Sequence, residues 1–390
     1  MLSYRFLFDI AIILLSTKFL GIVTKKFKMP QVVGALMAGL VLGPAMLDVL
    51  HETEFISQMA ALGVIVLMFT AGLETDISEL KKTGKVSFVV AVFGVIIPLL
   101  FGLLVSSFFN RGDLSYNGTS SLLKNIFIGI ILTATSVSIT VETLKELGKL
   151  NTRTGNTILG AALIDDILGI VGLTIITSMA DPSVDILEVL FKIVLFFVFC
   201  FIVGYLFHKV FVKWIDRYSK DMRRFVIVSF VFCLLLAFIA EEFFGVADIT
   251  GAFIAGLIIS NTERTKYINA RFETLSYILL SPIFFASVGI KVELTSMSMT
   301  IVLFTLLLLI AAVSSKVIGC FLGAKFFDYK TKESLQVGVG MVSRGEVALI
   351  VANKGMAVGL MNPYFLAPIV IVVVFTTVVT PILLKLTFKN

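Results

Sequence analysis

The sequence predicts an all-α membrane protein that crosses the bilayer many times, and three observations indicate this fold class. Hydrophobic residues make up 58% of the 390 residues and charged residues 15%, with a mean hydropathy of +1.04. Soluble domains are only about 45–50% apolar and carry about 25% charged residues, so a soluble fold could not bury this apolar surface. Apolar stretches long enough to span a bilayer recur along the chain, and basic residues gather between alternate stretches.

Thirteen apolar stretches are predicted as transmembrane helices. A helix needs about 20 apolar residues to cross the hydrocarbon core of the membrane. Most of the stretches reach this length, whereas the second and the ninth look short. In chain order the predicted helices cover residues 5–24, 30–47, 55–73, 86–109, 122–142, 155–180, 186–208, 224–244, 247–260, 273–290, 297–323, 335–360 and 364–384.

The basic residues predict the orientation of these helices. Cytoplasmic loops of membrane proteins carry an excess of lysine and arginine. With the N-terminus outside, most basic residues fall on inner connections, and the outer ends hold only Arg5, Arg111, Lys124, Lys291 and Lys354. The sequence therefore predicts an integral protein of the plasma (inner) membrane with a cytoplasmic C-terminus. This placement explains the net charge of +6 without a nucleic-acid partner.

An internal repeat relates the two halves of the chain. Residues 34–40 read GALMAGL and residues 251–257 read GAFIAGL, an offset of 217 positions that also relates Gly72 to Gly289. The copies are an odd number of predicted helices apart, so they cross the membrane in opposite directions. Inverted repeats are typical of secondary transporters, whose sites lie near the midplane at broken helices. The alternative is coincidence, since helix packing in membranes already favours small residues.

Two adjacent carboxylates, Asp165 and Asp166, lie in the middle of the predicted helix 155–180. An ionisable group inside the bilayer costs about 2.5–3.5 kcal/mol on insertion scales and is therefore a functional candidate. Adjacent residues on a helix do not face each other, so one carboxylate can face a water-filled cavity while the other meets a neighbouring helix. A carboxylate binds either a proton or a hard cation. The alternative is a buried ion pair with no role in transport.

Lys316 is the natural counter-charge, because it lies deep in the predicted helix 297–323. A buried lysine needs a carboxylate partner to offset its desolvation. The alternative is that its long side chain snorkels to the inner membrane surface.

Two predicted helices have features of helices that break inside the membrane. The fifth contains four hydroxyl residues between positions 133 and 138, and the twelfth combines three glycines with Arg344 and Glu346. Non-helical backbone at this depth is tolerated only where protein or water covers it. The ends of the half-helices would supply fixed partial charges in mid-membrane. The alternatives are ordinary hydroxyl packing between helices and a purely structural pairing of Arg344 with Glu346.

These motifs together resemble those of the monovalent cation:proton antiporters, in the branch of the Kef-type potassium efflux systems and the bacterial Na⁺/H⁺ exchangers. Kef-type systems also carry a C-terminal nucleotide-sensing domain, which we do not expect in this chain. The matching stretches are PQVVGALMAGLVLGP at 30–44, LMFTAGLETD at 67–76, TATS at 133–136, GAALIDDILGI at 160–170, TGAFIAGLIIS at 250–260 and VGVGMVSRGEVALI at 337–350.

The resemblance implies a fold of thirteen helices in which two discontinuous helices cross at mid-membrane in a core domain. It implies that residues 1–80 and 224–292 form a dimerisation (scaffold) domain and that the protein is a homodimer. Residues 85–182 and 297–388 would form the core ion-translocation domain, and residues 185–222 a linker helix.

The resemblance also implies roles for individual side chains. Asp166 matches the essential carboxylate, which would bind Na⁺ and a proton, and the preceding Asp165 matches the acidic partner of Lys316. The other residues implied near the ion are two broken-helix hydroxyls and a charged cluster, namely Thr135, Ser136, Arg344 and Glu346.

We therefore expect a secondary active transporter, not an enzyme, that exchanges Na⁺ or another monovalent cation such as K⁺ or Li⁺ for H⁺ by alternating access. We expect net charge to move in each cycle, and we expect no cofactor besides the transported ions. The expected partners are those ions, the lipid bilayer and a second copy of the chain. The alternatives are a sodium-coupled symporter of a small organic anion, which needs a roomier polar cavity, and a channel, for which the sequence has no filter motif.

Overall fold

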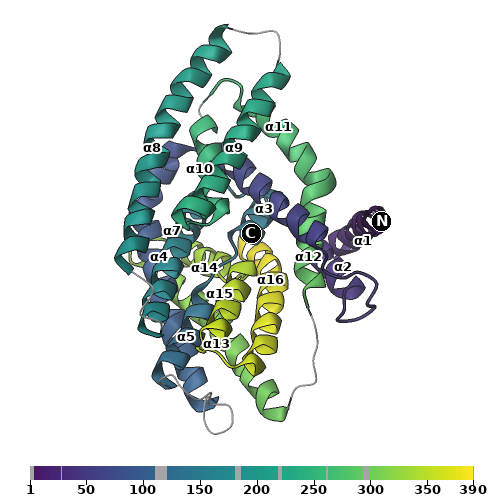
Figure 1. The fold of residues 1–390 in the computed structure, drawn as a ribbon, viewed down its shortest axis with the longest axis vertical. Helices are drawn as coiled ribbons and strands as arrows, with labels where there is room; N and C mark the ends of the chain where they lie inside the picture. Colours follow the sequence, from purple (N-terminus) through teal and green to yellow (C-terminus); the bar gives the residue numbers. More distant parts are fainter. Residues whose placement is uncertain are drawn as a thin grey trace.

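Every element of the structure, a computed structural model, is helical in the described residues, which are 4–27, 29–109, 121–180, 186–217, 222–260, 262–292 and 298–389. This confirms the predicted all-α class. Figure 1 shows an elongated bundle in which the C-terminus lies near the middle and the N-terminus at one edge. The helices of the first half are α1 (Arg5–Lys26), α2 (Gln31–Leu42), α3 (Glu54–Glu74), α4 (Ile77–Phe109), α5 (Ser121–Thr133), α6 (Val137–Glu146) and α7 (Arg153–Ala180).

The second half contains two short irregular turns within its helices. A π-helical turn joins two of them at Ser276–Leu280, and a 3-10 turn at Pro363–Phe365 precedes the last helix. The helices are α8 (Ile186–Arg217), α9 (Met222–Phe244), α10 (Asp248–Ser260), α11 (Thr265–Leu275), α12 (Ser281–Ile290), α13 (Met299–Lys325), α14 (Thr331–Gly340), α15 (Glu346–Ala357) and α16 (Leu366–Phe388).

Ten helices of the described chain are long and apolar enough to cross a membrane, when α5 is joined to α6 and α11 to α12. The other predicted segments correspond to α2, α10 and the pair α14–α15. Each of these helices is shorter than the about 20 residues that cross a bilayer. The membrane-spanning class is thus confirmed, and the count of thirteen crossings stays a prediction.

The helices pack in two groups. In the first, called the core group, α4 packs against α13, α5 and α7, and α13 also packs against α14 and α16. Helices α6 and α15 complete this group, since both contact α16. In the second, called the scaffold group, α3 packs on α10 and α12. Helix α10 contacts α9, α12 contacts α2 and α1, and α11 lies against α3. Helix α8 contacts α7 on one side and α9 on the other. The predicted division into a dimerisation domain, a core domain and a linker helix stays a prediction.

The internal repeat is structural and not a coincidence. Four of its glycines lie so close to the backbone of a neighbouring helix that a β-carbon would clash with it. At the crossing of α2 with α12, the close pairs are Gly39 with Ala286 and Gly289 with Leu36. At the crossing of α10 with α3, the close pairs are Gly256 with Phe69 and Gly72 with Phe253. Each residue of one crossing is 217 positions along the chain from its counterpart in the other.

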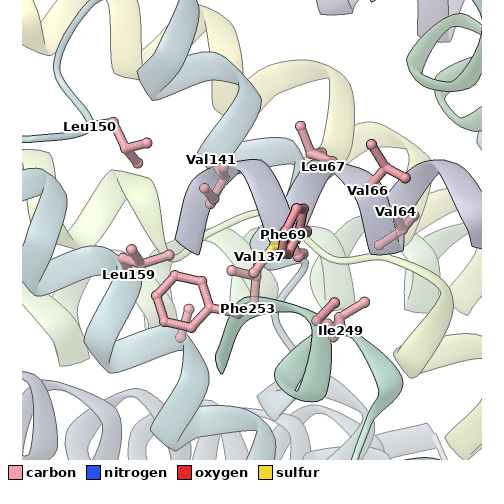
Figure 2. Packing of buried hydrophobic residues seen from close by; sticks show 14 of the residues in the cluster. Val64, Val66, Leu67, Phe69, Val137, Val141, Leu150, Leu159, Ile249 and Phe253 are labelled. Atoms are coloured by element: carbon pink, nitrogen blue, oxygen red, sulfur yellow. The ribbon is translucent and has the colours of Figure 1, made fainter. Parts of the chain in front are cut away.

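The buried apolar residues of both groups merge where α3 meets α6 and α10. Leu67 and Phe69 of α3 belong to the same buried cluster as Val137 of α6 and Phe253 of α10. Figure 2 shows these side chains gathered around Phe69. The cluster places the first turn of α6 directly beside the scaffold group.

Candidate functional site

Two helices are interrupted inside the buried part of the fold, as predicted. Helix α5 ends at Thr133 and α6 begins at Val137, while α14 ends at Gly340 and α15 begins at Glu346. The residues between the half-helices are buried. Backbone groups at these breaks lack helical partners and therefore need other ones.

The two breaks cross, and each provides hydrogen-bond partners for backbone groups of the other. The Ser136 N–H donates to the Ser343 carbonyl at 2.8 Å, and the Ser343 hydroxyl donates back to the Ser136 carbonyl at 2.8 Å. Thr140 Oγ1 donates to the carbonyl of Gly340, the last residue of α14, at 2.8 Å. The crossing of the two discontinuous helices is thus held by reciprocal hydrogen bonds.

Arg344 joins three segments at the crossing. Its side chain is buried, with 1% exposed, and donates to the carbonyls of Leu132 at 2.8 Å, Ala312 at 3.0 Å and Val342 at 3.0 Å. Leu132 lies in the last turn of α5, whose carbonyls have no partner within the helix. The guanidinium also offsets the negative end of that helix dipole. Glu346 begins α15, and its side chain lies outside the described part, so its predicted role stays untested.

The buried pair of Asp165 and Lys316 lies beside the first break. Lys316 Nζ is 3.0 Å from both carboxylate oxygens of Asp165, and Thr135 Oγ1 donates to Asp165 Oδ2 at 2.7 Å. Lys316 is fully buried and Asp165 is 2% exposed, so the lysine does not snorkel to the membrane surface. This is the contact that the family resemblance implied. Removing one partner of such a pair costs about 3–5 kcal/mol.

Asp166 follows on α7 and is 8% exposed. One residue along a helix turns the side chain by about 100°, so Asp166 points in a different direction from Asp165. The structure thus contains two buried carboxylates on neighbouring helix positions, of which Asp165 bonds the lysine. The role of Asp166 as the ion ligand stays a prediction.

The oxygen atoms placed together here are those of the Asp165 carboxylate and the Thr135 hydroxyl, 2.7 Å apart, and oxygen is the ligand type that suits a hard cation. In the chain as described, no group of three or more His, Cys, Asp or Glu side chains is placed to hold a metal ion.

A cavity of about 620 Å³ lies between the core group and the scaffold group. Its scaffold wall comes from α3, α12 and the junction of α9 with α10, and its core wall from α15 and α16. None of the predicted site residues whose side chains the structure describes lines it. Its polar lining residues are Glu52, Ser57, Glu241, Asp248, Ser287, Lys291 and Asn353.

Sequence reasoning missed two hydroxyl residues of the crossing, Thr140 and Ser343. Thr140 donates to the end of α14, and Ser343 bonds the opposite break. Both lie within or beside the polar runs that marked the breaks. For Thr140 the signal was a hydroxyl residue just after the run at 133–138, and for Ser343 it was a hydroxyl residue between Gly340 and Gly345.

A helical membrane bundle whose two broken helices cross beside buried carboxylates has the architecture of a secondary transporter. Residues 11–390 match the family model described as "Sodium/hydrogen exchanger, transmembrane". The chain belongs to this family.

Similar proteins agree with this assignment. The chain is 38% identical to the Na⁺/H⁺-K⁺ antiporter GerN of Bacillus cereus, over 99% of this chain and 97% of that protein. It is 36% identical to a Na⁺/H⁺ antiporter of Enterococcus hirae, over 98% and 97%. Its fold is similar to that of the sodium proton antiporter MjNhaP1 from Methanocaldococcus jannaschii, with a TM-score of 0.70 and 19% identity over 98% of both chains.

Proposed function

We propose that this protein is a secondary active transporter that exchanges Na⁺, or another monovalent cation such as K⁺ or Li⁺, for H⁺ by alternating access. The observation that carries the proposal is the buried Asp165–Lys316 pair next to Asp166 at the crossing of two broken helices. The family and the names of the relatives support exchange rather than symport with an organic anion.

In this proposal Asp166 binds the cation and the proton in competition. A single carboxylate that holds one or the other couples their movements, because the transporter in this proposal changes conformation only when one of the two is bound. Thr135 and Ser136, at the first break, are the hydroxyl residues proposed beside the ion. Arg344 holds the backbone of the crossing, and Glu346 is proposed to complete the charged cluster of the second break. We propose no cofactor and no enzymatic activity.

The proposed exchange is electrogenic. When Na⁺ binds Asp166, the Asp165–Lys316 pair is proposed to break, and Lys316 then releases its proton. On the return step Asp166 and Lys316 each take up a proton, so two protons cross for each Na⁺. The membrane potential would then bias the exchange by about 2.3 kcal/mol per elementary charge per 100 mV.

The scaffold group is proposed to form a homodimer while the core group moves against it. The positions of the basic residues support an N-terminus outside and a C-terminus in the cytoplasm. The plasma (inner) membrane is the location proposed for the protein.

Purified protein in liposomes, with a pH dye inside, tests the proposed function. A Na⁺ gradient directed outward should acidify the lumen, and K⁺ and Li⁺ gradients tested separately give the selectivity. Na⁺ efflux that requires an added organic anion and moves no protons would instead indicate symport. Na⁺ flux that leaves pH unchanged would contradict exchange.

A further inference from the structure

Glu146, the last residue of α6, bonds a helix of the other group. Its carboxylate accepts from the backbone N–H of Gln31 at 2.7 Å and of Val32 at 3.2 Å, at the start of α2. Helix α2 has no capping side chain of its own, because Pro30 precedes it. A carboxylate at a helix N-terminus satisfies free N–H groups and the positive end of the dipole. A residue of the core group therefore caps a helix of the scaffold group.

Lys145, the residue before it, bonds a second scaffold helix. Its Nζ lies 3.1 Å from Glu74 Oε1 and donates to Thr70 Oγ1 at 3.1 Å, both in the last turns of α3. Asn269 of α11 donates to the same Glu74 oxygen at 2.9 Å. The two residues at the end of α6 thus connect the core group to α2 and α3 at once. We call Lys145 and Glu146 the α6 latch.

The cavity and the α6 latch lie at opposite ends of α3. Ser57, Ala60 and Val64 of its first half line the cavity, whereas Thr70 and Glu74 bond the latch. From Ser57 to Glu74 a helix rises by about 25 Å, most of the thickness of a bilayer core. The two groups are separated at one side of the membrane and fastened at the other.

Helix α6 also begins at the crossing. Ser136, whose N–H donates to Ser343, is its N-cap residue, and the latch is at its C-terminal end. The helix has ten residues and therefore spans about 15 Å between the two. One rigid half-helix thus connects the candidate ion site to the contacts that fasten the two groups.

We propose that the α6 latch holds the conformation with the cavity open, and that ion exchange at the crossing moves α6 and releases the latch. Lys145 and Glu146 are then positioning residues of the transport cycle, since neither touches the ion. This inference rests on the proposed alternating access. Without the latch, the population should shift to the conformation in which the latch side is open and the cavity closed.

Cysteine labelling with a membrane-impermeant maleimide tests the latch. Val141→Cys reports the latch side, because Val141 lies one turn before Lys145 and is 1% exposed. Ser57→Cys reports the cavity. The native cysteines Cys200, Cys233 and Cys320 are all buried, so the parent protein serves as the blank.

Glu146→Gln should speed labelling of Val141→Cys by about fivefold or more, the factor that corresponds to loss of one capping contact. Labelling of Ser57→Cys should slow in the same variant. Glu188→Gln is the matched control, because Glu188 is an exposed carboxylate on α8 that pairs with Lys192. It should change neither rate. Unchanged rates in Glu146→Gln would overturn the proposal.

A charge exchange provides a second measurement that misfolding cannot imitate. Lys145→Glu alone should speed labelling of Val141→Cys, and adding Glu74→Lys should restore the slow rate, because the ion pair re-forms with reversed charges. Failure of the double variant to restore the rate would contradict the ion-pair part of the latch. The labelling rates do not depend on transport. They therefore test the α6 latch separately from Na⁺/H⁺ exchange, even if no exchange is observed.

Discussion

At the scale of single residues, the neighbouring carboxylates have different surroundings. Asp165 bonds Lys316 and the Thr135 hydroxyl, so its charge has protein partners. Asp166 lies on another side of α7, and its role with the exchanged ions stays a proposal. Two identical residue types thus point in different directions because they occupy successive positions on one helix.

Asp166→Asn should abolish Na⁺-driven proton movement, because asparagine keeps the shape but cannot exchange a proton. The variant should still insert and purify, since the Asp165–Lys316 pair stays intact. The measurement is the internal pH of liposomes after a Na⁺ jump. Robust proton flux from this variant would contradict the assignment of Asp166.

Lys316→Gln should remove the charge movement that accompanies exchange, because the second proton has lost its carrier. Wild-type protein should give a transient current on a solid-supported membrane after a Na⁺ jump. The variant also leaves Asp165 without its partner, so its thermal stability is measured alongside. Proton movement without charge displacement in wild type and variant alike would refute the two-proton scheme while leaving the exchange intact.

At the scale of elements, the broken helices persist because other groups complete their backbone hydrogen bonds. Arg344 supplies three donors to carbonyls, and Ser136 and Ser343 bond reciprocally. In a membrane each unsatisfied backbone group costs several kcal/mol. The crossing is therefore a stable element and not a frayed one.

The helix crossings of the repeat should be sensitive to a single methyl group. Gly39→Ala places a β-carbon into the carbonyl of Ala286, which forces α2 and α12 apart at a cost of about 1–3 kcal/mol. Gly84→Ala is the matched control, because nothing lies within 4 Å of the added carbon on α4. Thermal unfolding in detergent should show a lower midpoint for Gly39→Ala only. Equal midpoints would mean that the crossing tolerates a larger separation.

At the scale of the whole molecule, the core group and the scaffold group meet through the α6 latch at one end of α3 and are separated by the cavity at the other end. Inverted repeats allow each half to adopt the conformation of the other, which suits alternating access. In the proposed alternating access, one group moves against the other.

Linking the two groups across the cavity should stop transport. Ser57 on α3 and Asn353 on α15 both line it, so a bifunctional maleimide can join Ser57→Cys to Asn353→Cys. Each single variant treated with the same reagent is the control and should stay active. Full activity of the linked protein would argue for a fixed pore.

Hydropathy and motifs predicted the helices and the breaks because both depend on local sequence. Apolar stretches must be helical in lipid, and runs of hydroxyls or glycines mark where a helix stops. Length alone does not decide the count of crossings, because α2 and α10 are shorter than a helix that spans a bilayer. The pairing of Lys316 with Asp165 came from the family resemblance, because no spacing rule connects residues 151 positions apart.

The residues alone predict a helical membrane transporter with a repeat and two interrupted helices, because the bilayer imposes helix length, polarity and complete backbone hydrogen bonding on every segment. The packed helices were needed to see which carbonyls Arg344 bonds, that Ser136 meets Ser343, and that Lys145 and Glu146 fasten the two groups opposite the cavity. These contacts join residues far apart in the chain, and they depend on the angles at which packed helices cross, which no local pattern specifies.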